Sequence, residues 1–516
     1  MFECVLSDLL KGNLRDRAEH VAIVDGSVQV TYRDLAARVE QAAAWLTAKG
    51  IQRGDRVGVH LNKSVEEVVA MFAAWRIGAV MVQINHQWTA AQLDYVLRDC
   101  DVKALFIDAR PAVALATAEI PSTLQHVCVK GKTPEHAMFV AWASLPQATT
   151  LPPTPGIDTD LAALLYTSGS TGKPKGVMLT HLNIIAGARS VARYLEATRD
   201  DRLLSLLPFS FDYGLNQLMQ MCLVGGTVVL QKVMMPAEIA KALARYEITG
   251  FAAVPPVWIP LTQYLTDQPG SFPSLRYITN SGGKIPPSTL ELMPRAYPGV
   301  KIFLMYGLTE AFRSTYLPPE LFESKMGSMG RAIPNAETYI IKEDGVAGPG
   351  EQGELVHRGC LISLGYWGKP EATAEKIRVC PQLRHLIGEE KVCYSGDLVR
   401  IDEDGYYWFV SRADFMIKCS GFRISPTEVE DVVSKSGMVT HVVAFGAPDD
   451  LNGQVVEVAV TSNGHSFDEQ SLMAHCKQNM PHYMVPRKIH LWFNDMPRTG
   501  SGKLDRPAIV KQCLGM

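Results

Sequence analysis

The stretch YTSGSTGKPKGVMLTH, at residues 166–181, is the most informative part of the sequence. Its composition suits the binding of phosphate groups. Hydroxyl side chains, glycines and two lysines crowd into residues 167–176. Glycines let backbone amides approach a phosphate closely, hydroxyls donate to its oxygens, and lysines offset its charge. A Walker loop is excluded, because Thr167 stands where that motif needs its first glycine and Pro174 follows Lys173. Proline there favours extended backbone at Lys173, so we expect no helix directly after the loop.

Outward from this loop, towards the N-terminus, helical and strand-like patterns alternate. Apolar residues recur at helical spacing in residues 35–46 and 65–75. Short apolar runs at residues 56–60 and 79–84 predict strands. Such alternation is typical of parallel sheets with helical crossovers.

Residues 213–231 include no charged side chain, so we consider this segment as a candidate membrane span. The run contains Asn216, Gln217 and Gln220 and ends in a glycine pair followed by an apolar stretch at residues 227–230. These features favour a buried helix that turns into a strand. We therefore expect no membrane span.

The pattern changes in the last third of the chain. Residues 337–405 hold short strand-like runs separated by Asp-Gly and Pro-Gly turns, which predicts an antiparallel, barrel-like section. A boundary near residues 412–414 leaves a final segment with its own strands and helices, of the size of one small domain. The sequence thus predicts an α/β fold with a large N-terminal domain, residues 1–412, and a small C-terminal α+β domain, residues 413–516. The large domain combines mostly parallel sheets with the antiparallel section.

The composition excludes several classes of protein. Of the 516 residues, 47% are hydrophobic and 20% charged, as in a globular rather than a disordered chain. With 50 basic and 53 acidic residues, the net charge of −3 provides no basic excess for binding nucleic acid. The ten cysteines form no C-x-x-C pair, which argues against a disulfide framework or a zinc site. Glu3 and Asp8 argue against a secretory signal, so we expect a cytoplasmic protein.

Further segments resemble the motifs of one enzyme superfamily, and they occur in its order. They are residues 306–310 (YGLTE, for Y-G-x-T-E), 394–397 (YSGD, for T-G-D with serine replacing threonine), 411–414 (SRAD, for G-R-x-D with serine replacing glycine), 417–424, 428–430 and Lys503. With the loop at residues 166–181, they resemble the adenylate-forming (AMP-binding) superfamily. Its members are acyl- and aryl-CoA synthetases, the adenylation domains of nonribosomal peptide synthetases, and luciferases. The resemblance runs from residue 31 to Lys503 and is closest to standalone acyl-CoA ligases.

The resemblance implies an ATP-dependent reaction in two steps. A carboxylate attacks the α-phosphorus of ATP to give an acyl-adenylate and pyrophosphate, and a thiol then displaces AMP. The thiol is that of coenzyme A or of the phosphopantetheine on an acyl or peptidyl carrier protein. Because negative charge concentrates in the transition state, fixed donors, lysines and Mg²⁺ should dominate catalysis. The protein is expected to be a monomer or a homodimer.

The resemblance also implies roles for individual residues. Lys503, Thr171 and Glu310 would be catalytic, and Thr171 and Glu310 would help bind Mg²⁺. Tyr306 would stack on adenine, Asp397 would accept from the ribose hydroxyls, and Arg412 would reach the ribose or a phosphate. The remaining expected nucleotide-binding residues are Thr167, Ser168, Gly169, Ser170, Gly172, Lys173, Lys175, Gly283, Gly307 and Thr309.

A rotation of the small domain is implied as well, about a hinge at Asp414. One orientation would deliver Lys503 for adenylation. The other would bring the loop that contains Lys418 and Gly421 to the site, where it would guide the thiol.

Two segments depart from the superfamily patterns and bear on the acid substrate. Residues 281–284 read SGGK where G-G-[AE] is frequent, so Lys284 either touches substrate or nucleotide or points to solvent. The segment Ser210-Phe211-Asp212 resembles the S-F-D of amino-acid adenylation domains, whose aspartate pairs with the substrate's ammonium. The residues expected to line the acid pocket are Phe211, Asp212, Gly282, Lys284 and Met305.

Three functions follow from these observations. An acid–CoA ligase is favoured, because no carrier domain is attached to the chain. The alternative is an enzyme that adenylates an amino acid and loads it onto a carrier protein, as Asp212 suggests. A non-catalytic nucleotide-binding protein is disfavoured by the intact Thr171, Glu310, Asp397, Arg412 and Lys503.

Overall fold

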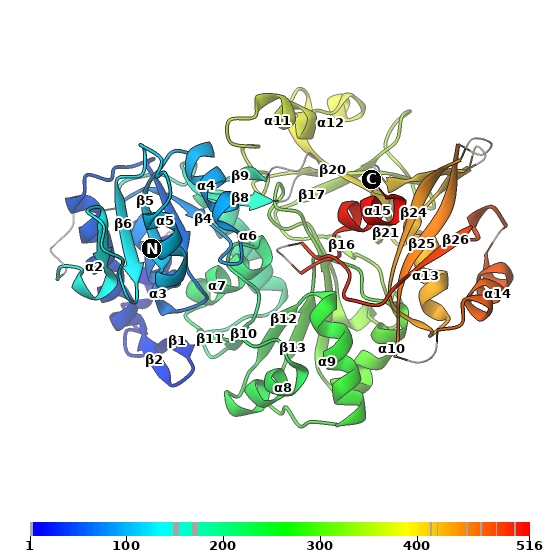
Figure 1. Cartoon of the computed structure of the whole chain (residues 1–516), viewed down its shortest axis with the longest axis horizontal. Coiled ribbons are helices and arrows are strands. Elements are labelled where there is room, and N and C mark those ends of the chain that lie inside the picture. Colours follow the sequence, from blue (N-terminus) through cyan, green and yellow to red (C-terminus); the bar gives the residue numbers. More distant parts are fainter. Residues whose placement is uncertain are drawn as a thin grey trace.

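The computed structural model describes residues 4–147, 154–167, 174–412, 415–419, 422–449, 453–464, 467–480, 482–499 and 502–515. These residues form four β-sheets with helices packed between and around them (Figure 1). Two large, mostly parallel sheets make up the first part of the chain, a curled antiparallel sheet follows, and a smaller α+β part ends it. The predicted fold class is confirmed.

The first large sheet has seven strands and receives the crossover helices α3 (Val65–Arg76), α4 (Ala90–Asp99) and α5 (Ala109–Ala116). All neighbouring strands are parallel except the last pair. The strand order is β7 (Phe139–Ala141), β6 (His126–Lys130), β5 (Val102–Asp108), β3 (Arg56–His60), β4 (Val80–Gln83), β8 (Leu161–Thr167) and β9 (Lys175–Thr180).

The predicted phosphate loop connects the antiparallel pair β8 and β9, and its central residues 168–173 lie outside the described part. Pro174 is followed by strand β9, as predicted, and not by a helix. Helix α6 (His181–Tyr194) begins only after this strand. The hydroxyl of Thr180 accepts from the Asn183 amide there, and this capping box fixes where the helix starts.

The second large sheet has nine strands, and its central strands β10 to β14 and β1 are parallel. Its order is β16 (Arg331–Ala332), β15 (Thr315–Leu317), β14 (Lys301–Tyr306), β13 (Tyr277–Asn280), β12 (Gly250–Ala253), β10 (Arg202–Ser205), β11 (Thr227–Leu230), β1 (Val21–Asp25) and β2 (Val28–Thr31). Its helices are α1 (Asp8–Asn13), α7 (Asp212–Val224), α8 (Pro236–Arg245), α9 (Pro255–Asp267) and α10 (Pro287–Ala296).

One apolar core joins the two large sheets. It includes Trp45 of α2 (Tyr32–Ala48), Trp75 of α3, Ile184 of α6 and Leu218 of α7, all almost completely buried. The uncharged run at residues 213–231 is therefore the buried helix α7 followed by strand β11, as predicted. Among the described residues, no helix has both the length and the apolar character needed to cross a bilayer.

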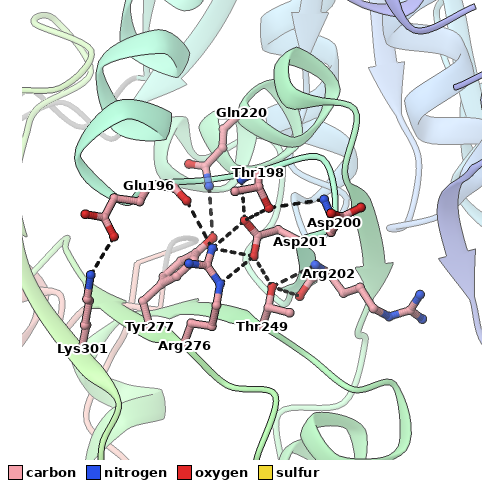
Figure 2. A network of polar contacts seen from close by, with 10 residues as sticks. All are labelled: Glu196, Thr198, Asp200, Asp201, Arg202, Gln220, Thr249, Arg276, Tyr277 and Lys301. Atoms are coloured by element: carbon pink, nitrogen blue, oxygen red, sulfur yellow. Dashed lines mark hydrogen bonds and ion pairs between the residues drawn. The ribbon is translucent and has the colours of Figure 1, made fainter. Parts of the chain in front are cut away.

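A network around the buried carboxylate of Asp201 ties together the amino ends of three parallel strands (Figure 2). Asp201 precedes β10, Thr249 precedes β12 and Arg276 precedes β13. The Asp201 carboxylate accepts from the Thr249 hydroxyl at 2.6 Å, and Arg276 Nη2 lies 2.7 Å from both of its oxygens. The backbone amide of Thr198 adds a further donor at 2.6 Å. The network fixes the amino ends of these strands. The polar residues of the candidate site, described below, lie at the carboxyl ends.

The antiparallel sheet consists of β17 (Glu337–Ile341), β18 (Gln352–Arg358), β20 (Lys391–Ile401), β19 (Ile377–Val379) and β21 (Tyr407–Arg412), with helices α11 (Pro370–Lys376) and α12 (Arg384–Ile387) beside it. In the register of β20 and β21, Asp397 lies directly opposite Arg412. Cross-strand partners have neighbouring side chains. The sheet thus brings together two residues that the motifs had predicted separately.

The last part of the chain has its own five-stranded sheet and apolar cluster. Its strands are β23 (Phe422–Ile424), β22 (Ile417–Cys419), β25 (Gly453–Ser462), β24 (Val439–Asp449) and β26 (Lys488–Trp492). Helices α13 (Pro426–Lys435), α14 (Glu469–Asn479) and α15 (Arg506–Leu514) accompany them. In Figure 1 this part is coloured orange to red and lies beside α9 and α10.

The Asp201 network predicts a large difference between two adjacent aspartates. Asp201→Ala should lower the free energy of unfolding by about 2–4 kcal/mol, because it leaves buried donors without an acceptor. Asp200→Ala is the matched control, since the Asp200 side chain is 83% exposed, and should change stability by less than about 0.5 kcal/mol. Urea denaturation measures both changes. Equal effects of the two substitutions would contradict a stabilising role for the network.

Candidate functional site

A cavity of about 550 Å³ lies at the carboxyl ends of β13 and β14, between the large sheets, the antiparallel sheet and the last part of the chain. Most of the residues predicted from the motifs line it, although they come from distant segments. They are Thr167, Lys175, Gly282, Gly283, Lys284, Met305, Tyr306, Gly307, Thr309, Glu310, Asp397, Arg412 and Lys503. The structure therefore brings these residues together at one place.

Some predicted residues fall outside this description. The predicted site residues that lie outside the described part of the chain are Ser168, Gly169, Ser170, Thr171, Gly172, Lys173, Asp414 and Gly421. Lys418 is described, as the central residue of strand β22. The predicted phosphate contacts, the Thr171 metal ligand, the hinge and the thiol channel thus stay predictions.

A cluster of three residues forms the cavity wall where the antiparallel sheet meets the carboxyl end of β14. The hydroxyl of Tyr306 donates to Asp397 Oδ2, and Arg412 Nη1 lies 3.1 Å from Asp397 Oδ1. Burial raises the pKa of the Asp397 carboxyl, against the opposing influence of Arg412 and Tyr306. Burial also raises the pKa of the Tyr306 hydroxyl, which therefore stays protonated and keeps donating. Asp397 is thus held in a fixed position with its side chain facing the cavity.

A cation that the motif analysis missed lies next to this cluster. Lys376, the last residue of α11, donates from Nζ to the backbone oxygen of Ser395 at 2.7 Å and lines the cavity. No local pattern predicts a functional role for Lys376, because it is one of several charged residues in a short helix without buried residues.

Lys503 reaches the cavity from the opposite side. Its Nζ lies 5.6 Å from the centre of the Phe211 ring. Gly282, which has a φ of +78°, lies beside it, and a Cβ atom there would be 3.3 Å from Lys503 Cε and 3.2 Å from the Phe211 ring. Both the backbone conformation and the close contact therefore require glycine at this position. Burial lowers the pKa of the Lys503 ammonium, while Asp212 and Asp397 raise it.

Glu310 follows the end of β14 and forms a further polar contact in the cavity. The hydroxyl of Tyr366, a second residue missed by the motif analysis, donates to Glu310 Oε1 at 2.5 Å. Nζ of Lys175 lies 5.2 Å from the centre of the Tyr366 ring. Glu310 lines the cavity together with Thr167 and Lys175, which flank the predicted phosphate loop. Its carboxylate is a hard oxygen ligand, so Glu310 fits a Mg²⁺ ion, which often takes only one or two protein carboxylates.

Asp212 lies behind Phe211, at the first turn of α7, and it already has a cationic partner. Arg313 Nη2 lies 2.9 Å from Asp212 Oδ2, and both side chains are almost completely buried. The guanidinium also lies over the Tyr213 ring, 5.0 Å from its centre. Arg313 was missed by the motif analysis, although a charged residue directly after the apolar pair 311–312 was a signal that could have singled it out.

Lys284 lines the cavity and forms an ion pair that the sequence analysis did not predict. Its Nζ donates to Asp431 Oδ2 of α13 at 2.6 Å, and each side chain is 33% exposed. This ion pair connects the loop after β13 with the last part of the chain. It lies next to Gly282 and hence next to the position of Lys503.

Comparison with known proteins gives two consecutive family matches. A model described as AMP-binding enzyme matches residues 10–367, and one described as AMP-binding enzyme C-terminal domain matches residues 428–503. A long-chain-fatty-acid–CoA ligase of Bacillus subtilis (strain 168) is 28% identical over 517 residues, which cover 94% of this chain and 90% of that ligase. Tyrocidine synthase 2 of Brevibacillus parabrevis is 29% identical over 515 residues, which cover 99% of this chain but 14% of that synthase.

Solved structures similar to this chain extend over nearly its whole length. The anthranilate CoA ligase AuaEII in complex with anthranoyl-AMP has a TM-score of 0.88 and 25% identity, covering 99% of this chain and 97% of its own. The o-succinylbenzoate CoA synthetase (MenE) from Bacillus subtilis in complex with ATP and magnesium has a TM-score of 0.83 and 25% identity. It covers 97% of this chain and 99% of its own.

The Lys284–Asp431 pair predicts how firmly α13 is held. Lys284→Ala should make backbone amides of α13 exchange about two- to fivefold faster, the range expected for a partly exposed ion pair. Hydrogen–deuterium exchange by mass spectrometry measures this. Lys241→Ala is the control, because it removes an ion pair confined to α8 and should leave α13 unchanged. Identical exchange in the Lys284 variant and the unmodified protein would show that the pair holds nothing in place.

Proposed function

This chain belongs to the AMP-binding enzyme family and is an acid–thiol ligase of the AMP-forming type, and from that premise we propose that it makes an acyl-CoA from a carboxylic acid, ATP and coenzyme A. The resemblance seen in the motifs is thereby confirmed at the level of the family. The proposal concerns the steps, the acceptor and the residues that carry them.

One observation carries the proposal: Lys503 lies in the same cavity as Tyr306, Asp397 and Arg412. In the first step a carboxylate oxygen attacks the α-phosphorus of ATP, and the bond to pyrophosphate breaks. In the second step the thiolate of coenzyme A attacks the acyl carbon, and AMP leaves with the electron pair of the broken bond. Both steps concentrate negative charge on oxygens, which a fixed cation stabilises in the transition state.

The positions of the side chains suggest a distribution of roles. Tyr306 would lie against adenine, and Asp397, held by Tyr306 and Arg412, would accept from the ribose hydroxyls. Arg412 would extend from the ribose towards the phosphate. Lys503 would lie between the acid's carboxylate and the α-phosphate, a role supported by its position in the cavity lining beside Phe211 and Gly282. Gly283, Gly307 and Thr309 would contact the nucleotide.

Glu310 and the predicted phosphate loop fit a magnesium ion. Glu310, steadied by Tyr366, would supply one carboxylate ligand, and Thr171 is proposed as a second ligand from its motif alone. When bound, Mg²⁺ offsets charge on the β- and γ-phosphates. Lys175 and the loop residues before it would bind those phosphates.

We further propose a division of labour along the chain. Residues 1–412 would hold the nucleotide and acid, and residues 413–516 would deliver Lys503. A hinge at Asp414 would let this second part turn, so that Lys418 and Gly421 come to guide the thiol.

The alternative, loading of an amino acid onto a carrier protein, is supported by the likeness to a tyrocidine synthase and by the S-F-D segment. The ion pair with Arg313 speaks against it. An ammonium group at Asp212 would have to share that carboxylate with a buried guanidinium, and two cations would then face one anion in a desolvated site. A non-amino carboxylic acid is the better fit.

Lys503 provides the sharpest test of the proposed mechanism. Lys503→Ala should slow acyl-adenylate formation by roughly 10²–10³-fold, which corresponds to about 3–4 kcal/mol. Acyl-CoA formation from a supplied acyl-adenylate should remain largely intact. Pyrophosphate exchange measures the first step and thioester release the second, with Lys511→Ala of α15 as a control on an exposed lysine. Equal loss of both steps would argue against a role confined to adenylation.

The metal role of Glu310 can be tested separately. Glu310→Gln should raise the Mg²⁺ concentration needed for half-maximal adenylation, since a neutral amide is a poorer ligand for a hard cation. Binding of a preformed acyl-adenylate, which lacks the pyrophosphate, should change little. A comparable loss of adenylate binding, measured by calorimetry, would assign Glu310 to the structure of the cavity instead.

A further inference from the structure

Helix α7, which begins directly after Phe211, has a buried polar face. Asp212, Asn216 and Gln220 recur at intervals of four residues, so they lie along one side of the helix. All three are at most 5% exposed. A polar stripe buried on a helix of an otherwise apolar core is unusual, because each buried polar group needs a hydrogen-bond partner.

Several polar atoms of this region, among the described residues, have no partner within the protein. They are Arg313 Nε, Asn216 Nδ2, Ser314 Oγ and Asn280 Oδ1. Within the described part of the chain, Arg313 makes one hydrogen bond, to Asp212, although a guanidinium carries five donor hydrogens. Arg313 is 3% exposed and Asn216 is 2% exposed, so bulk water does not solvate their side chains freely.

These atoms belong to one region. Asn216 Nδ2 and the ring of Phe312, the residue before Arg313, both lie beside Gly187, where a Cβ atom would be 3.5 Å from the amide nitrogen and 2.5 Å from the ring. The backbone amide of Ser314 donates to the oxygen of Tyr306 at 3.3 Å, so this segment runs alongside the end of β14.

The region is also connected to the reaction site. Asn280 and Met305 line the 550 Å³ cavity, and the Tyr194 hydroxyl donates to Met305 Sδ at 2.8 Å. Lys503 Nζ lies 5.6 Å from the centre of the Phe211 ring, and Asp212, the next residue, pairs with Arg313 at 2.9 Å. An acid bound with its carboxylate at Lys503 therefore lies next to the segment that carries Asp212 and its partner Arg313.

Building on the proposed function, we propose that the substrate is a short carboxylic acid with a neutral, hydrogen-bond-accepting oxygen in its chain, held by Arg313 Nε and Asn216 Nδ2. Of the four unpartnered atoms, these two are N–H donors, so the group complementary to them is an acceptor, such as an oxo, hydroxyl or carboxamide oxygen. An alkyl chain placed here would leave both donors unsatisfied in a desolvated site.

The charge of the region favours a neutral group over a second carboxylate. Arg313 is already neutralised by Asp212, so the pair has no net charge. A second carboxylate would add an unbalanced anion next to the Asp212 carboxylate. A neutral oxygen satisfies the donors without that cost.

The test compares acids of one carbon skeleton in both half-reactions. Alkanoates of four to sixteen carbons, the same short chains with an oxo or hydroxyl group at successive positions, and the matching dicarboxylates are assayed for pyrophosphate exchange and for acyl-CoA. We expect kcat/KM for the best oxygen-bearing monocarboxylate to exceed that of its alkanoate by roughly 10²-fold or more, because a site built to hydrogen-bond a group rejects the analogue without it.

Variants assign the preference to the two residues. Asn216→Leu should lower the ratio of oxygen-bearing acid to alkanoate by about tenfold, since it removes one donor. Arg313→Lys should lower it similarly, because it preserves the charge that Asp212 requires and removes Nε. Gln220→Leu, one turn further along α7, is the matched control, since Gln220 Nε2 donates to the Tyr277 hydroxyl, and it should preserve the ratio. Thermal unfolding verifies that each variant folds.

Each outcome decides between the proposals. A preference for alkanoates or dicarboxylates, with acyl-CoA still formed, overturns this inference and leaves the ligase function standing. An unchanged ratio in both the Asn216 and Arg313 variants also overturns it. Failure of every acid to yield AMP and a thioester overturns the proposed function itself, and this inference with it.

Discussion

The placement of the Lys503 ammonium in a partly closed cavity is the interaction on which the rest of the site depends. A cation withdrawn from water is costly unless anions compensate it. Asp212 and Asp397 provide that compensation, and each is itself paired with an arginine, Arg313 and Arg412. Within this group of five side chains, the three cations and two carboxylates leave one excess positive charge. A positive charge suits a site where carboxylate and phosphate oxygens meet.

This arrangement imposes requirements on distant parts of the fold. The parallel strands β13 and β14 end at the cavity that contains Lys503, while the Asp201 network fixes the opposite end of β13. The antiparallel sheet supplies Asp397 and Arg412 as cross-strand partners. Glycine at position 282 allows Lys503 to approach, and the Lys284–Asp431 pair joins the same loop to α13. Each of these features acts on the position of a single amine.

Local patterns predicted most of the framework, and the reason is physical. The periodic segments 35–46 and 65–75 form α2 and α3: α2 is longer by a few residues and starts directly after its cap Thr31, whereas α3 starts as predicted, after its cap Ser64, and ends one residue later. Pro174 correctly indicated that no helix follows the phosphate-type loop. What escaped prediction depends on contacts over long sequence separations. Arg313 meets Asp212 across 101 residues and Lys284 meets Asp431 across 147, and no local pattern encodes either partner.

The central claim is that the acid's carboxylate itself attacks the α-phosphorus of ATP. The most direct measurement uses an acid whose carboxylate oxygens are both ¹⁸O, with ATP, Mg²⁺ and coenzyme A, followed by mass spectrometry of the nucleotide product. Because the oxygen that joins acyl carbon to phosphorus leaves with AMP, the account predicts one ¹⁸O atom in the phosphate of each AMP and one in each acyl-CoA. AMP without ¹⁸O, or ADP as the nucleotide product, would contradict it.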